Sequence, residues 1–206
     1  VTVGVLIVAA GLTAGCSSGD DSDGKRVLDV YAAASLKKTF TEIEKQYEKV
    51  HTDVDVKLTF DGSSALVNQI QQGASVDVLA TADEQTMDKV ADKVADPVPF
   101  ATNTLVIVTA PGNPKGITNF ADLNRGGIST VVCAVEVPCG AATAQVEKNT
   151  GVTLAPVSEE SSVTDVLGKI TSGQADAGLV YVTDAARAGD KVTAIAFPES
   201  RVVVNR

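Results

Sequence analysis

Short apolar runs alternate with amphipathic stretches along most of the chain. Residues 27–36, VLDVYAAASL, begin as the β-branched and aromatic run that is typical of a buried strand. Small alanines follow, and Ser35 then occupies the N-cap position of a helix whose apolar residues recur at helical spacing as far as Tyr47. The pattern therefore predicts a strand that turns directly into a helix.

The same order of strand, small-residue turn and helix recurs along the chain. Further strands are predicted at residues 54–60, 76–80, 102–109, 130–135, 177–181 and 192–197. Helices are predicted to begin at Ser63, Ala82, Pro138 and Val163, and residues 158–162, SEESS, are predicted to form a polar loop. This alternation indicates an α/β fold with mostly parallel strands.

Turns from a strand end into a helix start are where open α/β sheets bind ligands. The first N–H groups of a helix lack partners inside it and lie at the positive end of its dipole, so they can hold an anion without a basic side chain. Ser35, Ser63 and Tyr181 occupy such places. The alternative is that both serines only cap their helices and that Tyr181 lies at the edge of the core.

Charge and composition exclude several classes of function. The 206 residues carry a formal net charge of −9, which argues against a nucleic-acid partner, because such binding requires a basic surface. The single histidine, His51, argues against a His-rich metal site and a His-based catalytic triad. A serine hydrolase would need such a base, and the chain has no G-x-S-x-G motif.

The chain has three cysteines, and two of them, Cys133 and Cys139, lie close together in VVCAVEVPCG. In an exported protein these two either form a disulfide or remain two buried thiols. A zinc site would need more ligands than they provide.

Residues 1–15 form an apolar run that resembles the h-region of a signal peptide. Ala14-Gly15-Cys16 is similar to a lipoprotein processing site, so we expect Cys16 to carry a lipid anchor and residues 16–26 to include a polar, flexible tether. These features predict export and attachment to the extracytoplasmic face of the cell membrane.

Five segments together carry a family resemblance: YAAASL (31–36), DGSSAL (61–66), Pro138-Cys139-Gly140, Ser162-Val163 and GLVYVTDA (178–185). In this order and spacing they resemble the periplasmic molybdate-binding proteins of ABC importers, the ModA family. The resemblance covers about residues 27–200.

The resemblance implies an oxyanion site made of neutral donors. It assigns hydroxyl groups and backbone N–H groups of Ser35 and Ser63, backbone N–H groups of Cys139 and Val163, and the hydroxyl of Tyr181. A tetrahedral dianion offers only acceptor oxygens, so a site with donors and no acceptor discriminates against protonated oxyanions. The ligand is then molybdate or tungstate, with no cofactor, no side-chain metal coordination and no enzymatic activity.

The resemblance also implies a two-lobed fold, the type II periplasmic binding protein or Venus flytrap, with a hinge. Lobe 1 is expected at residues 27–102 and 197–206, and lobe 2 at 103–196, with crossovers at 102–103 and 196–197. The family has a further strand and helices that complete lobe 1, and this C-terminal part is expected to be missing here. The implied partner is an ABC permease, and the protein is expected to be a monomer.

Three alternatives remain open: a receptor for another tetrahedral oxyanion such as sulfate, a serine hydrolase, and a sensory input module. Asp61 departs from the family pattern, because a carboxylate aimed at the anion would repel it. We expect Asp61 to face outward or to cap a backbone N–H. Lys37, Lys38 and Arg187 are expected to be solvated helix residues.

Overall fold

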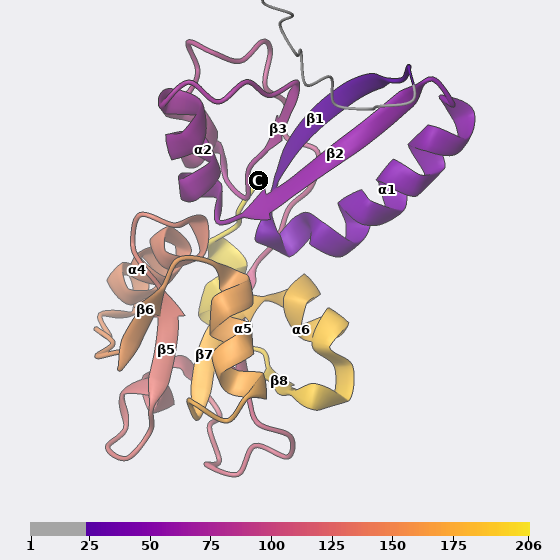
Figure 1. Ribbon diagram of the computed structural model, residues 1–206. Coiled ribbons are helices and arrows are strands. Elements are labelled where there is room, and N and C mark those ends of the chain that lie inside the picture. The colour runs from indigo at the N-terminus through magenta and orange to yellow at the C-terminus, as the bar shows by residue number, and fades with distance from the viewer. Residues whose placement is uncertain (1–23) are drawn as a thin grey trace, which may run out of the picture.

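The computed structural model describes residues 24–206, which form two lobes lying one above the other (Figure 1). The upper lobe contains a three-stranded sheet in the order β2-β1-β3, and the lower lobe a five-stranded sheet in the order β6-β5-β7-β4-β8. Helices accompany the strands of both sheets. The predicted α/β, two-lobed fold is confirmed.

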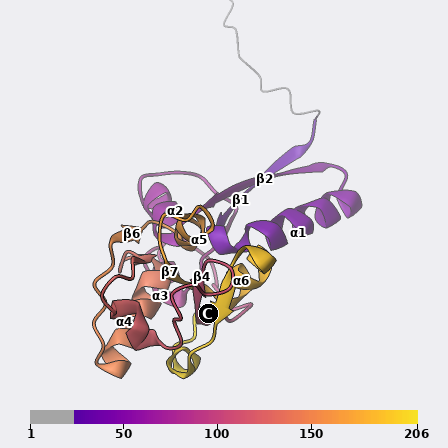
Figure 2. The same ribbon diagram turned by 90° about the horizontal axis from the view of Figure 1, so that it is seen from below.

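The upper lobe has the central strand β1 (Arg26–Ala33), which pairs in parallel with β2 (Val54–Asp61) and β3 (Val78–Ala80). Its helices are α1 (Lys37–Val50), α2 (Ser63–Gln71) and the short α3 (Glu84–Asp88). Seen from below, α1 runs beside β1 and β2 (Figure 2). The apolar side of α1 contributes Phe40 and Tyr47 to a small core around Val30, Val54 and Val56.

The turn between β1 and α1 differs from the prediction. A 3-10 turn, η1 (Ala34–Leu36), separates the two elements, and Leu36 rather than Ser35 is the cap residue of α1. No side chain caps either element. The tight turn places Ser35 inside the first turn of helical backbone, where its hydroxyl cannot accept from the next amides as an N-cap side chain does.

The lower lobe contains β4 (Leu105–Thr109), β5 (Thr130–Cys133), β6 (Ser158–Glu160), β7 (Ala177–Tyr181) and β8 (Thr193–Ile195). Strand β5 pairs in parallel with β6 and β7, whereas β4 runs antiparallel to both β7 and β8. Its helices are α4 (Pro138–Thr150), α5 (Val163–Thr171) and α6 (Val182–Ala188), with 3-10 turns η2 (Phe120–Asn124), η3 (Gly189–Lys191) and η4 (Pro198–Val202).

Strand β6 lies where a polar loop was expected, so that prediction is wrong. Its residues Ser158, Glu159 and Glu160 pair with Val131, Val132 and Cys133 of β5. The carbonyl of Glu160 also accepts from the N–H of Ala134 at 2.9 Å. Because β6 is an edge strand, its polar side chains can face solvent while its backbone completes the sheet.

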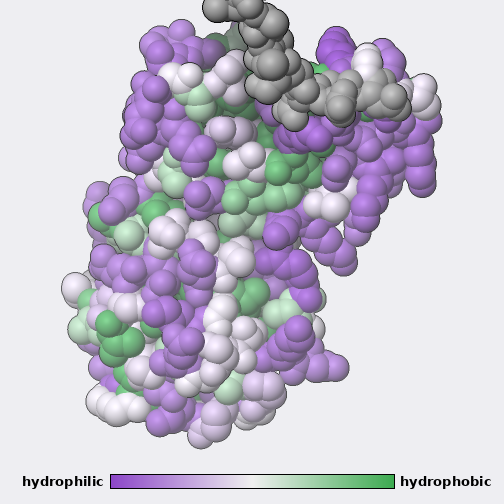
Figure 3. Space-filling view, in the orientation of Figure 1, coloured by the Kyte–Doolittle hydropathy of each residue, from purple (hydrophilic) through white to green (hydrophobic). Residues whose placement is uncertain are grey.

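The larger hydrophobic core belongs to the lower lobe, where β4, β5 and β7 are buried along their whole length. Hydrophilic residues cover much of the visible face, and hydrophobic residues show in the upper lobe between α2 and α1 (Figure 3).

The chain returns toward the upper lobe later than expected. Phe197 stacks on Phe120 with ring centroids 5.6 Å apart, and Val203 is buried in the same core. Residues 197–203 therefore pack with lobe 2 rather than lobe 1. The two crossing segments meet at an antiparallel bridge in which the N–H of Asn103 donates to the carbonyl of Asn205 at 2.9 Å, and the reverse bond measures 3.0 Å.

The predicted signal segment, Cys16 and most of the tether lie outside the described residues. Within residues 24–206, no helix is long and apolar enough to cross a membrane.

Candidate functional site

A small cavity of about 10 Å³ lies where the two lobes meet. Its wall comes from both lobes: Ala33, Ala34, Ser35, Gly62, Ser63 and Ala82 from the upper one, and Val137, Pro138, Ser162, Val163 and Tyr181 from the lower one. Among the described residues, none with a charged side chain lines this cavity. Four of the five residues predicted to bind the oxyanion are therefore brought together on one wall.

Helix starts surround this cavity. Ser63 is the first residue of α2, Pro138 of α4 and Val163 of α5, and Ser35 lies in the 3-10 turn that leads into α1. The opening turns of all four elements present amides without helical partners and the positive ends of the helix dipoles. The convergence creates a positive potential without a basic side chain, which suits a small anion.

Ser63 is buried at 2% exposure, and its hydroxyl oxygen accepts from the N–H of Ala82 at 3.0 Å. This bond occupies an acceptor position of the hydroxyl and leaves its proton without a partner among the described residues. A hydroxyl can donate only one hydrogen bond, so the remaining proton of Ser63 is available to a ligand in the cavity.

Ser35 is half-buried, and its hydroxyl makes no hydrogen bond within residues 24–206. Its carbonyl accepts from Nη1 of Arg187 in α6 at 3.4 Å, across the boundary between the lobes. Arg187 also pairs with Asp184 at 2.8 Å, so the prediction that Arg187 is a solvated residue is wrong. The attraction of the buried carboxylate draws the guanidinium inward beside the cavity.

Asp184 is fully buried, and one of its carboxylate oxygens, Oδ2, has no hydrogen-bond partner among the residues described. Burial raises the pKa of Asp184 to about 6, although the charge of Arg187 acts in the opposite direction. Ionisation of Asp184 is therefore unfavourable in the folded protein.

Tyr181 is the last residue of β7 and is 2% exposed. Burial raises the pKa of its hydroxyl, and the negative charges of Asp83 and Asp184 raise it further. The phenol thus stays neutral and protonated at physiological pH. Its oxygen accepts from the side-chain amide of Asn205 at 3.0 Å, so the phenol proton, like that of Ser63, remains available.

Ser162 caps helix α5, whereas the next residue, Val163, offers a free backbone N–H. The hydroxyl of Ser162 donates to the carboxylate of Asp165 at 2.7 Å and accepts from the N–H of Asp165 at 3.2 Å. Ser162 is therefore the N-cap of α5 and its hydroxyl proton is already used. Val163, at the first helical position, presents a backbone N–H that has no partner inside the helix.

Cys139 is the predicted site residue that does not line the cavity. Its side chain is buried and forms a disulfide with Cys133, with the two Cα atoms 5.6 Å apart. Pro138 before it reaches the cavity but has no N–H, so the first amide that α4 can offer is the backbone N–H of Cys139. Close packing fixes this turn, because a Cβ on Gly140 would lie 1.8 Å from the carbonyl oxygen of Ala134.

The turn after β2 packs directly on the other lobe. A Cβ on Gly62 would lie 2.2 Å from the carbonyl oxygen of Ser161, and the hydroxyl of Ser64 donates to the carbonyl of Glu136. Asp61 accepts from the N–H of Gly62 at 2.7 Å, which confirms the expectation that its carboxylate caps a backbone amide.

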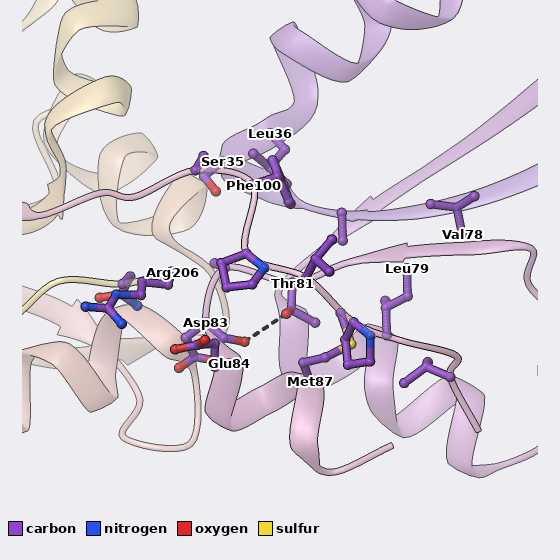
Figure 4. Close-up of a pocket in the computed structure, with 18 of the residues that line it drawn as sticks. Ser35, Leu36, Val78, Leu79, Thr81, Asp83, Glu84, Met87, Phe100 and Arg206 are labelled. Atoms are coloured by element: carbon purple, nitrogen blue, oxygen red, sulfur yellow. Dashed lines mark hydrogen bonds between the residues drawn. The ribbon is translucent and has the colours of Figure 1, made fainter. Parts of the chain in front are cut away.

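A second, much larger cavity of about 1150 Å³ opens beside the upper sheet (Figure 4). Apolar side chains such as Leu36, Leu79 and Phe100 line it, and Asp83 and Glu84 lie near Arg206 at one side. Ser35 and Tyr181 line this cavity as well as the small one, but its acidic residues outnumber its basic ones, so it suits a dianion poorly. Residues 24–206 contain no cluster of His, Cys, Asp or Glu that could hold a metal ion.

Sequence reasoning missed Ala82, Arg187 and Asn205 as parts of the site's surroundings. Each contacts a predicted site residue from a different segment of the chain: Ala82 contacts Ser63, Arg187 contacts Ser35, and Asn205 contacts Tyr181. No local pattern marks such residues, since their role follows from the way the lobes pack.

A family model described as "Bacterial extracellular solute-binding protein" matches residues 28–205. The chain belongs to this family. It is also 51% identical to "Molybdate-binding protein ModA" of Mycobacterium tuberculosis, over 97% of this chain and 78% of that protein. The resemblance seen in the motifs is thereby confirmed, as is the expectation that this is a binding protein and not an enzyme.

Solved structures agree with this assignment. The periplasmic molybdate-binding protein of Azotobacter vinelandii matches with a TM-score of 0.62 and 25% identity, over 75% of this chain and 71% of that one. The sulfate-binding protein SubI of Mycobacterium tuberculosis matches with a TM-score of 0.68 but 17% identity, over 84% of this chain and 71% of that one. The second likeness concerns the fold alone.

Proposed function

We propose that the chain captures molybdate, and also tungstate, in the small cavity between its lobes. The observation that carries the proposal is a wall without a charged side chain, on which the hydroxyl protons of Ser35, Ser63 and Tyr181 have no partner among the described residues. The backbone N–H groups of Ser35, Ser63, Cys139 and Val163 complete the set. The 51% identity with a protein named for molybdate binding supports the same ligand.

The strength of such a site follows from its hydrogen bonds. A hydrogen bond to a charged group contributes about 1.5–3 kcal/mol net, so seven donors supply roughly 10–21 kcal/mol before ordering costs. Micromolar affinity needs about 8 kcal/mol, which is within reach of this set. Hydrogen phosphate is disfavoured because no carboxylate lines the cavity to accept its proton.

The lobes already touch at Gly62 and Ser161, and a cavity of about 10 Å³ is smaller than the anion, so the lobes separate to admit molybdate and then close around it. The closed form then presents one combined surface to the membrane subunits of an ABC importer. In this proposal the protein is exported, held at the membrane by a lipid on Cys16, and acts as a monomer. Replacing Cys16 with Ala should release the protein from the membrane fraction while molybdate binding persists.

Isothermal titration of the full chain tests the proposal. We expect tight binding of molybdate and tungstate with similar affinities, weaker binding of sulfate, and no heat with hydrogen phosphate. Absence of molybdate binding would overturn the proposal. Tighter binding of sulfate than of molybdate would identify a sulfate receptor instead.

A further inference from the structure

Asn205 is buried at 8% exposure and joins two pieces of the cavity wall. Its side-chain amide nitrogen donates to the hydroxyl oxygen of Tyr181 at 3.0 Å and approaches the carbonyl oxygen of Pro138 at 3.4 Å. Both contacted residues line the small cavity, whereas Asn205 does not.

The contact with Pro138 fixes the orientation of the amide. A backbone carbonyl can only accept a hydrogen bond, so the NH₂ group of Asn205, and not its oxygen, must face Pro138. The same NH₂ group then faces the phenol. Tyr181 is consequently the acceptor in its bond with Asn205.

The main chain holds Asn205 in this place independently of its side chain. Its N–H and carbonyl pair with the carbonyl and N–H of Asn103 at 3.0 and 2.9 Å, where the chain crosses between the lobes. A side-chain substitution therefore leaves the backbone bridge available.

We propose that Asn205 is a positioning residue that sets the polarity of the Tyr181 hydroxyl. Its NH₂ group donates to the phenol oxygen and cannot accept a hydrogen bond. The phenol proton therefore does not bond to Asn205 and can donate to the oxyanion. This inference rests on the proposed function and adds to it a residue that never touches the ligand. The N–H of Ala82 does the same for Ser63 from the main chain.

Replacement of Asn205 with Asp tests the polarity directly. A carboxylate of the same shape accepts from Tyr181 instead of donating, which withdraws the phenol proton and adds a like charge near the anion. We expect the Kd for molybdate to rise about 100-fold or more. Asn205→Ala, which removes the donor without adding an acceptor, should raise it several-fold.

Asn103→Asp is the matched control. It makes the same change of shape and charge at the same crossing, but its side chain contacts Thr183 and not Tyr181. We expect less than a threefold change in Kd. Similar thermal unfolding midpoints of the unliganded Asn205→Ala and wild-type proteins would show that the fold is retained.

The role through Tyr181 is isolated by repeating both Asn205 substitutions in a Tyr181→Phe background. The Asn205→Ala change should then cause no further loss, and the Asn205→Asp change only the part due to charge. The chain has no Trp and three Tyr, so the near-ultraviolet difference spectrum on adding molybdate reports on the phenols. It should shift in the wild type and lose that shift in Asn205→Asp and Tyr181→Phe.

The outcomes separate the two proposals. If the wild type does not bind molybdate, the proposed function fails. If the wild type binds and Asn205→Ala loses as much affinity in the Tyr181→Phe background as in the wild type, the positioning role is overturned. Equal weakening of molybdate binding by Asn205→Asp and Asn103→Asp would overturn that role as well.

Discussion

The backbone N–H of Ala82 donates to the hydroxyl oxygen of Ser63 at 3.0 Å. A residue just after β3 thereby directs the hydroxyl at the start of α2, two segments that are separate in sequence. The bond occupies one acceptor position of the hydroxyl from within the protein. The hydroxyl proton stays free to donate to a ligand, which is the property that a dianion site requires.

Ser63→Ala should weaken molybdate binding about 10- to 150-fold, because one hydrogen bond to a charged ligand contributes about 1.5–3 kcal/mol. Titration calorimetry measures the change. Ser172→Ala is the control, since that exposed hydroxyl only contacts the carbonyl of Lys169 in the last turn of α5. Equal affinities of the two variants would remove Ser63 from the site.

Gly62→Ala tests how closely the lobes pack. The backbone at Gly62, with φ −57° and ψ 137°, accepts an alanine, so the only conflict is the 2.2 Å approach to the carbonyl of Ser161 in the other lobe. We expect at least a tenfold rise in the Kd for molybdate and a loss of about 1–3 kcal/mol in the free energy of unfolding.

Gly168→Ala serves as its control, because a Cβ there meets nothing within 4 Å in the middle of α5. It should raise the free energy of unfolding by about 0.5–1 kcal/mol and leave the Kd unchanged. A Gly62→Ala protein that binds like this control would show that the boundary tolerates a methyl group.

The raised pKa of Asp184 should make the free energy of unfolding depend on pH. Its folded pKa of about 6 lies above the ordinary value of 3.8, so the folded state holds this proton more strongly than the unfolded state. Ionisation of this carboxyl therefore lowers the free energy of unfolding as the pH rises from about 4 to 6, and the loss grows no further well above pH 6. A shift of about two pH units corresponds to roughly 3 kcal/mol.

Asp184→Asn should lack this dependence. The free energy of unfolding of the wild type minus that of the variant should therefore fall by about 2–3 kcal/mol as the pH rises from 4 to 7. Denaturant titrations across this range measure it. A constant difference would mean that the carboxyl does not titrate as its burial indicates.

The disulfide between Cys133 and Cys139 should stabilise the turn that begins α4. Joining residues six apart removes unfolded-state freedom equivalent to about 2 kcal/mol. The Cys133→Ser/Cys139→Ser double variant should lose about that much in the free energy of unfolding. Molybdate affinity should fall as well, because the amide of Cys139 lies in this turn. A reductant that leaves the wild-type unfolding midpoint unchanged would contradict the prediction.

Much of this fold could be predicted because hydrophobic periodicity and turn residues act locally. The strand ending at Ala33, the helix from Ser63 and the capped helix at Val163 all follow from such local signals. The edge strand β6 was missed because its residues are polar. They form a strand through backbone pairing with β5, which the hydropathy pattern does not reveal.

The site was predictable only in part for the same reason. Ser35, Ser63, Val163 and Tyr181 stand in recognisable motifs, and the structure brings them to one cavity. The neighbours that direct these residues do not stand in recognisable motifs. Asn205, for example, reaches Tyr181 only through the folding of the chain at the lobe boundary. The late crossing itself follows from the burial of Phe197 against Phe120, a contact between distant positions.

A crystal structure of the full chain with bound molybdate tests the donor cage most directly. The anion should lie between the lobes, with its oxygens about 2.7–3.2 Å from the hydroxyls of Ser35, Ser63 and Tyr181 and from the amides of Cys139 and Val163. Direct hydrogen bonds from a lysine or arginine side chain to the anion, or molybdate bound in the large cavity next to Leu79, would contradict the account.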